Sequence, residues 1–235
     1  MYKKKQNTHT KYYNNKGEVI PSCTTILSIL NESNGLLFWA NNLGFNGIKL
    51  TDEQNFNTNI GTLTHKLIEI NLNKNINNEK TDFNHYTDSE RFHALRAYRN
   101  FKLFKKENKF KPLLLEKELV SNEYNFGGTI DYIGKVGDVN VICDYKTSKS
   151  FSFKYALQLS GYRQLFLENR NNLKIKKNFN LDGVLILRLS KFNKGEYETK
   201  FISNDELNEY WELFKYLINI YSLSKKLDNK FNSLK

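Results

Sequence analysis

The stretch Gly128-Thr-Ile-Asp131-Tyr-Ile-Gly134-Lys-Val-Gly-Asp138-Val-Asn-Val-Ile-Cys-Asp144-Tyr-Lys146 decides the fold. Asp131 ends one apolar run, and Asp144 and Lys146 end the next. Gly134–Asp138 predicts a tight turn between the runs, and the apolar residues that follow it predict a short buried strand. Two neighbouring strands therefore bring Asp131, Asp144 and Lys146 close to one point.

The spacing of these residues also predicts which way they point. Alternate residues of a strand share a face, so we expect Asp144 and Lys146 on one face and Tyr145 on the other. Two carboxylates can hold a divalent cation through oxygen, and a nearby ammonium can steady the charge of an attacked phosphate. Such a set is typical of metal-dependent phosphodiester hydrolysis.

The pattern Gly-x-x-Asp, followed thirteen residues later by Asp-x-Lys, resembles the core of the PD-(D/E)XK nucleases. Within them it is similar to the RecB-type and mitochondrial genome maintenance exonuclease group, which includes many phage exonucleases. Further segments resemble that group in the same order: Pro21–Leu27 (P-S-x-T-x-I-L), Gly61–His65 (G-x-x-x-H), Gln158–Tyr162 (Q-x-x-x-Y), a late strand at Gly183–Leu187 and a closing helix at Tyr210-Trp211. Asp-x-Lys alone is a weak signal, whereas five motifs in order are a specific one.

The resemblance implies an α/β fold, namely a restriction-endonuclease-like core with a central mixed β-sheet flanked by helices and an N-terminal helical cap. Residues 1–110 would form the arm and cap, and residues 111–235 the nuclease core, in one integrated domain. The resemblance further implies that His65, Asp131, Asp144 and the backbone carbonyl of Tyr145 hold Mg²⁺ or Mn²⁺. Lys146 would touch the attacking water or the scissile phosphate.

Other residues receive supporting roles. Glu116 and Glu118 share a strand face, and the resemblance implies one assisting acid here. The register of Glu116 ahead of Asp131 favours Glu116, with Glu118 as the alternative. Gln158 and Tyr162 lie four residues apart on one helix face, which by resemblance meets DNA and the catalytic lysine. The predicted DNA contacts are Tyr162, Thr147, Ser148, Lys149 and Arg163. Glu69, one turn beyond His65, is either an orienting partner or a solvated charge.

Composition agrees with a polyanionic partner. The 235 residues carry a formal net charge of +11, and a strongly basic enzyme usually meets nucleic acid. The chain has no long apolar run and its N-terminus has no apolar leader segment, so we expect neither a membrane nor secretion, and an intracellular location. The two cysteines, Cys23 and Cys143, are too few for a four-cysteine iron–sulfur cluster, so none is expected.

The pattern along the chain predicts helices, then a β-meander, a helix, strands and a final helix. After an N-terminal arm or hairpin with a basic run at Lys3–Lys5, the expected elements are helices over 25–30, 36–43, 61–72, 88–106, 153–168 and 204–226, and strands over 113–121, 126–134, 139–146, 182–189 and 197–202. Gly44–Asn59 is expected to be irregular, and Phe92 is expected on the buried side of its helix.

The sequence thus predicts a Mg²⁺- or Mn²⁺-dependent DNA exonuclease acting on single-stranded ends in replication, repair or recombination. Two alternatives stay open. One is a structure-specific or duplex-end nuclease of phage recombination, and the other is a DNA-binding module with a decayed site. Intact His65, Asp131, Asp144 and Lys146 argue against decay.

Overall fold

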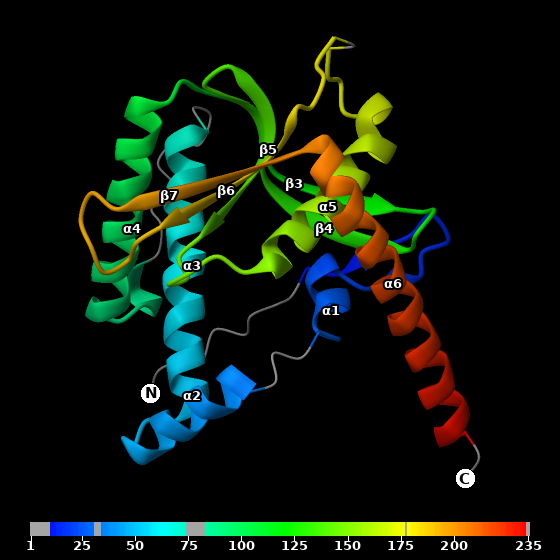
Figure 1. Ribbon diagram of the computed structural model, residues 1–235, viewed down its shortest axis with the longest axis horizontal. Coiled ribbons are helices and arrows are strands. Elements are labelled where there is room, and N and C mark those ends of the chain that lie inside the picture. Colours follow the sequence, from blue (N-terminus) through cyan, green and yellow to red (C-terminus); the bar gives the residue numbers. More distant parts are fainter. Residues whose placement is uncertain (1–9, 31–33, 74–82, 177, 234–235) are drawn as a thin grey trace.

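A mixed five-stranded sheet organises the molecule (Figure 1). The computed structural model describes residues 10–30, 34–73, 83–176 and 178–233. The strands, in spatial as in chain order, are β3 (Phe110–Ser121), β4 (Phe126–Val136), β5 (Val139–Lys146), β6 (Gly183–Leu189) and β7 (Tyr197–Ser203). Neighbours run antiparallel except β5 and β6, which are parallel. The predicted α/β class with a central mixed sheet is confirmed.

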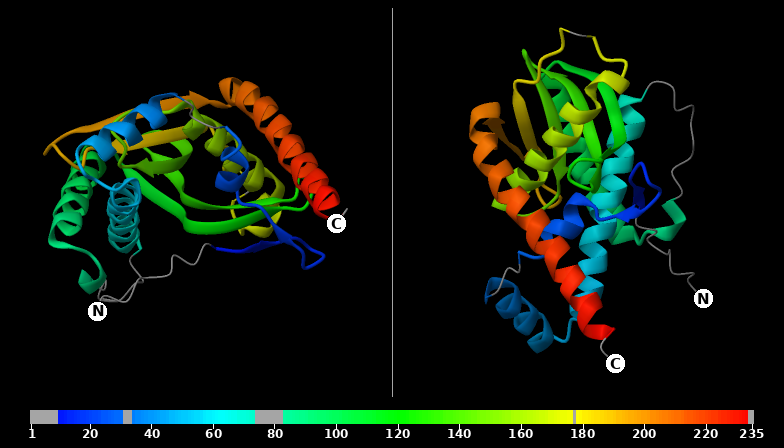
Figure 2. Two further views of the ribbon diagram at one scale, coloured as in Figure 1. Left: turned by 90° about the horizontal axis from the view of Figure 1, so that it is seen from below. Right: turned by 90° about the vertical axis from the view of Figure 1, so that its right-hand side faces the viewer.

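Helices cover both faces of this sheet (Figure 2). On one face lie α1 (Cys23–Leu27), α5 (Phe153–Asn169) and α6 (Asn204–Asn232); on the other lie α3 (Leu50–Leu72) and α4 (Asp88–Glu107). Because α5 carries the chain from β5 across to β6, those two strands can run parallel. The remaining elements are a hairpin of β1 (Tyr12–Tyr13) and β2 (Val19–Ile20), helix α2 (Asn34–Phe45), and the short turns η1 (Phe83–His85) and η2 (Arg170–Asn172).

Two apolar clusters fix the sheet between these layers. Ile142 of β5 packs with α1, α5 and α6, whereas Cys143 and Tyr145 pack with α3 and α4. This division follows from the alternation of strand side chains. Both cysteines of the chain are free and buried, as small apolar residues usually are. No helix among the described residues is both long and apolar enough to cross a membrane.

Most predicted elements form near their expected bounds. Strand β5 has the predicted limits, and the hairpin β1–β2 lies in the predicted arm, although Lys3–Lys5 fall outside the described residues. Helix α4 begins after Thr87, whose hydroxyl and Glu90 form a reciprocal capping box. Helix α6 has the same device at Ser203 and continues to Asn232, beyond the expected end.

The prediction that Gly44–Asn59 is irregular is wrong. Helix α2 continues to Phe45, and α3 begins at Leu50 with Asp52 and Glu53 in its first turn, where acids favour the helix dipole. The sequence does not predict the beginning of α3, because the asparagines in its first turns have low helix propensity. Tertiary packing overrides that propensity: Ile60 lies fully buried in a cluster with Tyr86 and Ala94.

Two smaller expectations are also wrong. Phe92 is 53% exposed, because alanines at 94 and 97 bring α4 against its neighbours and turn Phe92 outward. The predicted turn at Gly134–Asp138 shrinks to Gly137 and Asp138, since β4 runs to Val136. Gly134 instead permits close approach of two strands: a Cβ there would lie 2.4 Å from the carbonyl oxygen of Lys111.

Candidate active site

The site lies where strands β4 and β5 separate. Their pairing runs from Val136–Val139 to Tyr132–Cys143, and Asp131 and Asp144 occupy the next position, just beyond the last pair. Both carboxylates are buried, with 8% and 2% exposure. The backbone N–H of Tyr145 donates to Asp131 Oδ2 over 3.0 Å. Asp131 and Asp144 are therefore buried side by side at the point where β4 and β5 diverge, which we call the fork.

Lys146 lies on the same strand face as Asp144, as the alternation predicts. Its Nζ is 2.7 Å from Asp144 Oδ2 and donates to Gln158 Oε1 over 3.0 Å. Gln158 in turn donates from Nε2 to the Tyr162 hydroxyl over 2.8 Å. Because Gln158 and Tyr162 lie one turn apart on α5, this helix holds the lysine in place.

A glycine makes room for that arrangement. A Cβ on Gly128 of β4 would lie 2.6 Å from the ring of Tyr162. Only a residue without a side chain lets β4 approach α5 so closely. Gly127, its neighbour, does the same for Tyr12, whose ring would meet a Cβ at 2.3 Å.

Helix α3 brings His65 to the other side of the fork. Its Nε2 lies 2.8 Å from the carbonyl oxygen of Tyr145, and its Nδ1 lies 3.4 Å from Asp131 Oδ2. Potential ligand atoms of His65, Glu116 and Asp131 all lie within 4.8 Å of one another. A pocket of about 370 Å³ opens onto this group, lined by Gly61, Thr62, His65, Lys66, Glu69 and Glu116.

The structure separates the two glutamates that the sequence left as alternatives. The pairs Leu115–Tyr132 and Lys117–Ile130 place Glu116 directly opposite Asp131. Glu116 has a left-handed backbone conformation with φ of 44°, which is uncommon for a residue with a side chain. Glu118 is exposed and lines a different pocket, beside Tyr12.

Glu69 does not contact His65. Its Oε2 instead accepts from Lys66 Nζ over 3.0 Å on the same helix. It still faces the pocket, so it adds negative charge near Glu116 without orienting the histidine.

The electrostatics of the site show a shortage of positive charge. Burial, and then the neighbouring Asp131 carboxylate, raises the pKa of Glu116 to about 8. Burial lowers the pKa of His65, but Asp131 and then Glu116 outweigh it and raise that pKa to about 9. At neutral pH both Glu116 and His65 therefore carry a proton. A divalent cation bound between them would replace these protons as the source of positive charge.

The neighbouring pair, Asp144 and Lys146, is held together by its opposite charges. Burial raises the pKa of Asp144, and Lys146 opposes that rise. Burial alone would lower the pKa of Lys146, but Asp144 and Asp131 raise it, so the ammonium stays charged. Asp144 Oδ2 is buried and, despite its ion pair, accepts no hydrogen bond of good geometry, so it keeps lone pairs for a further partner.

These residues fit a divalent cation. Two ligands that share one ion at about 2.1 Å lie about 3 Å apart, close to the separation of His65 Nδ1 and Asp131 Oδ2. One imidazole with several oxygens suits Mn²⁺ and is compatible with Mg²⁺. Asp144, a predicted ligand, lies outside the three-residue group and beside Lys146; the carbonyl oxygen of Tyr145 lies against His65.

The residues expected to bind DNA lie on two sides of the site. Thr147 lies near Gly61, which is one helical turn before His65 on α3. A Cβ on Gly61 would lie 3.6 Å from the Thr147 hydroxyl. Ser148 donates from its hydroxyl to the carbonyl oxygen of Ser150, and Lys149 is exposed with its ammonium 5.7 Å from the Phe192 ring. Arg163 lies apart from this group, because it donates to Asn208 of α6 over 3.1 Å.

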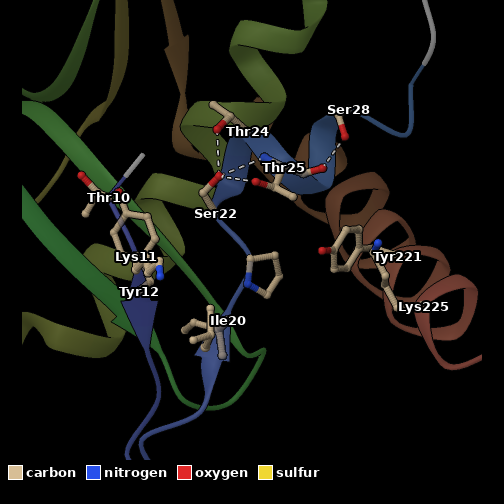
Figure 3. A pocket seen from close by; sticks show the side chains of 12 residues that line it. Thr10, Lys11, Tyr12, Ile20, Ser22, Thr24, Thr25, Ser28, Tyr221 and Lys225 are labelled. Atoms are coloured by element: carbon tan, nitrogen blue, oxygen red, sulfur yellow. Dashed lines mark hydrogen bonds between the residues drawn. The ribbon is translucent and has the colours of Figure 1, made fainter. Parts of the chain in front are cut away.

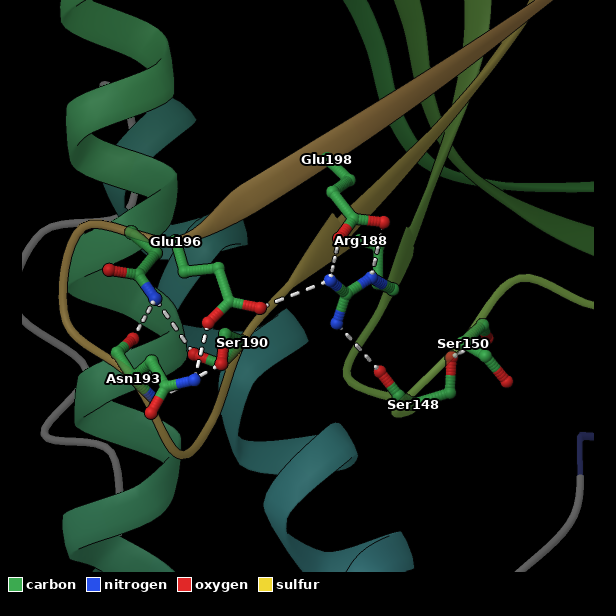
Figure 4. Close-up of polar contacts among 8 residues, drawn as sticks. Ser148, Ser150, Arg188, Ser190, Asn193, Glu196 and Glu198 are labelled. Carbon is green, nitrogen blue, oxygen red and sulfur yellow. Dashed lines mark hydrogen bonds and ion pairs between the residues drawn. The ribbon is translucent and has the colours of Figure 1, made fainter.

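Sequence reasoning missed Arg188, which holds the loop after Lys146 (Figure 4). It pairs with Lys146 across β5 and β6, and its guanidinium donates to Glu196, Glu198 and the carbonyl oxygen of Ser148. A single arginine in an otherwise apolar strand was the available signal, because such a charge is almost never buried without partners.

A second pocket contains none of the residues of this site (Figure 3). It has a volume of about 1150 Å³ and lies between the hairpin β1–β2, α1 and the far half of α6. Its walls carry hydroxyls at Thr10, Ser22, Thr24, Thr25 and Ser28, and the ammonium groups of Lys11 and Lys225. Tyr12 links the pocket to β4, because its hydroxyl lies 2.8 Å from that of Thr129, two residues before Asp131.

Comparison with known proteins identifies the family. A search of curated proteins finds no match. A sequence model described as the PD-(D/E)XK nuclease superfamily matches residues 38–228, which is well over half of the chain. The matched part contains β3 to β7, α5 and every residue of the group around the fork, and nucleases of this superfamily typically use divalent metals. The chain therefore belongs to the PD-(D/E)XK nuclease superfamily.

Proposed function

We propose that this protein is a Mg²⁺- or Mn²⁺-dependent DNA exonuclease that acts on single-stranded ends. The observation that carries the proposal is the position of His65, Glu116 and Asp131 around one point, next to the Lys146–Asp144 pair. Membership of a nuclease superfamily supports hydrolysis of phosphodiester bonds. The preference for single strands and for ends rests on the resemblance to the mitochondrial enzyme group.

In the proposed hydrolysis, one group of residues binds the metal ion and another positions the attacking water. His65 through Nδ1, Glu116 and Asp131 would hold the cation, with Asp144 completing the set. The carbonyl oxygen of Tyr145 would accept from His65 Nε2, the other ring nitrogen, and so orient the imidazole. A bound cation supplies a Lewis acid for the phosphate and lowers the pKa of water. Lys146, fixed by Gln158, would orient the water whose oxygen attacks phosphorus. The bond to the 3′ oxygen then breaks, and that oxygen takes up a proton, which leaves a 5′-phosphate on the other product.

The large pocket supports the binding of a strand. Hydroxyls and lysines are the groups that usually contact phosphate oxygens. Lys11 and Lys225 face this pocket from opposite walls, and Tyr12 joins it to the strand that carries Asp131. We infer that a DNA strand entering or leaving the site passes through this pocket. The net charge of +11 assists the approach of the DNA.

The decisive experiment is a time course on end-labelled single-stranded, duplex and circular DNA, with Mg²⁺, Mn²⁺ or EDTA. We expect linear single strands to be degraded only with metal, and circles to be spared. The label position gives the polarity of digestion. Cut circles would replace the exonuclease proposal with an endonuclease, and binding without cleavage of any substrate would favour a DNA-binding module.

The substitution Lys146→Ala tests the site itself. We expect cleavage to fall by at least about 100-fold, because an ammonium placed at the reacting phosphate is lost. DNA affinity and the circular dichroism spectrum should change little. The matched control is Lys106→Ala, which removes one exposed ammonium from the end of α4 and should cut normally. Cleavage by Lys146→Ala at the unaltered rate would refute the site assignment.

A further inference from the structure

Helix α6 has two apolar stripes, and only one of them has a partner. The inner stripe packs into the core through Leu207, Phe214, Leu217 and Ile218. The outer stripe, which we call the α6 seam, consists of side chains between 40% and 74% exposed: Leu213, Tyr216, Ile220, Leu223, Leu227 and Phe231. A surface helix normally turns polar residues to this side, so an apolar stripe here needs a partner.

The spacing of the seam is that of a coiled coil. From Leu213 to Leu227 its members follow one another at three, four, three and four residues. This alternation places apolar residues at both core positions of a heptad, so that they face a second helix along a narrow line. The seam extends over about 27 Å at the usual helical rise. The second half of α6 projects away from the sheet and is accessible to such a helix (Figures 1 and 2).

The charges along the helix select the partner and its direction. Glu209 and Glu212 are exposed at the start of the seam, where Glu212 also pairs with Lys215 over 2.7 Å. Lys226 and Lys230 are exposed at its end and outnumber Asp228 there. Two parallel copies would place acid beside acid and lysine beside lysine. Two antiparallel copies place the acidic start of each helix beside the basic end of the other. The seam is thus complementary to itself in one orientation only.

We propose that the chain forms a homodimer in which two α6 seams pack antiparallel about a two-fold axis. One register brings the apolar residues together: Ile220 meets Leu223 of the second copy, and Tyr216 meets Leu227 of the second copy. In this register Glu212 lies next to Lys230 of the second copy. The contact is isologous, so two copies satisfy it and no chain of copies grows.

The dimer leaves the remainder of the molecule open. Tyr221, Ser224 and Lys225 line pockets on another face of α6 and are not part of the seam. The group around Lys146 lies on the sheet, away from the projecting half of the helix. Each copy therefore keeps its own site, and the proposal stands or falls independently of the proposed nuclease activity.

Measurement of the mass in solution tests the dimer. We expect the full chain to sediment as a concentration-dependent dimer at micromolar concentrations, and Ile220→Glu to sediment as a monomer with unchanged circular dichroism. The matched control is Ser222→Glu, which places the same charge on the same turn outside the seam and should remain dimeric. A monomer at every concentration would overturn the proposal, as would equal effects of the two substitutions. So would a monomer that sediments with anionic lipid vesicles through Ile220.

Cysteine crosslinking tests the direction. Both native cysteines are buried, so an introduced seam cysteine is the accessible thiol. With a short bis-maleimide, Tyr216→Cys combined with Leu227→Cys should give a covalent dimer in high yield, because the two positions face each other across the antiparallel pair. Either substitution alone should give little. Efficient crosslinking of both single variants would show a parallel pair and overturn the antiparallel register.

Discussion

At the scale of the residue, the site depends on a few backbone positions as much as on its ionisable groups. The sequence predicted that Asp144 and Lys146 share a face, because strand alternation is a rule of local geometry. It could not decide between Glu116 and Glu118, since the same rule places both on one face. The left-handed backbone at Glu116 and the register opposite Asp131 separate them, and both depend on pairing with another strand.

Gly128 offers a test at this scale. In Gly128→Ala the new methyl group would collide with the ring of Tyr162 and move Gln158, the partner of Lys146. We expect the free energy of unfolding to fall by about 2 kcal/mol. We also expect kcat to fall roughly tenfold, because Lys146 loses its fixed position. Urea unfolding and steady-state cleavage measure the two effects.

The control for this change is Gly44→Ala. A Cβ on Gly44 meets no atom within 4 Å, and alanine favours the helix α2 that contains it. Stability should hold or rise slightly, with cleavage unaffected. Equal losses of stability and cleavage in both variants would mean that close packing of Tyr162 against Gly128 is not required.

At the scale of the element, periodic segments were predictable and segments stabilised by distant contacts were not. Strand β5 and the end of α3 have clear apolar periodicity, and both were predicted. The first turns of α3 were not, because their asparagines favour a loop and only packing against Tyr86 and Ala94 makes them helical. Phe92 was misplaced because large apolar residues, rather than alanines, were expected to define the buried side of α4.

Arg188 gives the prediction at this scale, since it ties β6 and β7 to the loop after β5. In Arg188→Gln the guanidinium bonds to Glu196, Glu198 and the Ser148 carbonyl are lost. We expect stability to fall by about 2 kcal/mol, a typical value for charge-assisted bonds. The KM for DNA should rise, because the loop with Ser148 and Lys149 loosens.

Lys200→Gln is the matched control, because it removes one exposed positive charge from β7. Thermal unfolding and cleavage kinetics of the two variants should differ clearly. If Arg188→Gln behaved like its control, Arg188 would have no part in holding the loop.

At the scale of the whole molecule, the surplus of positive charge was readable from composition, but its distribution was not. The pocket between the hairpin, α1 and α6 joins Lys11 to Lys225, which are more than 200 positions apart in the chain. No local pattern connects such residues. The fold class, in contrast, could be inferred from the order of motifs, because that order determines which elements meet.

Salt dependence tests this pocket. For single-stranded DNA, each phosphate contact contributes about 0.7 to the slope of log affinity against log salt concentration. We expect Lys225→Ala to weaken binding and to reduce that slope by about this amount, and Lys11→Ala to do the same. Lys106→Ala, on α4, should leave the slope unchanged. Fluorescence anisotropy across a salt series supplies the data, and three identical slopes would exclude the pocket as the strand's route.

The bond between His65 and the carbonyl oxygen of Tyr145 joins residues 80 positions apart. Contacts so distant in sequence require closure of a long loop and form slowly. During synthesis the chain leaves the ribosome from its N-terminus, so α3 must wait for β5 before this bond can form. We expect assembly of the site to be a late event, which leaves the nascent chain harmless to the nucleic acid around it. Pulse-labelled hydrogen exchange during refolding would then find the amides of α3 protected after those of β4 and β5.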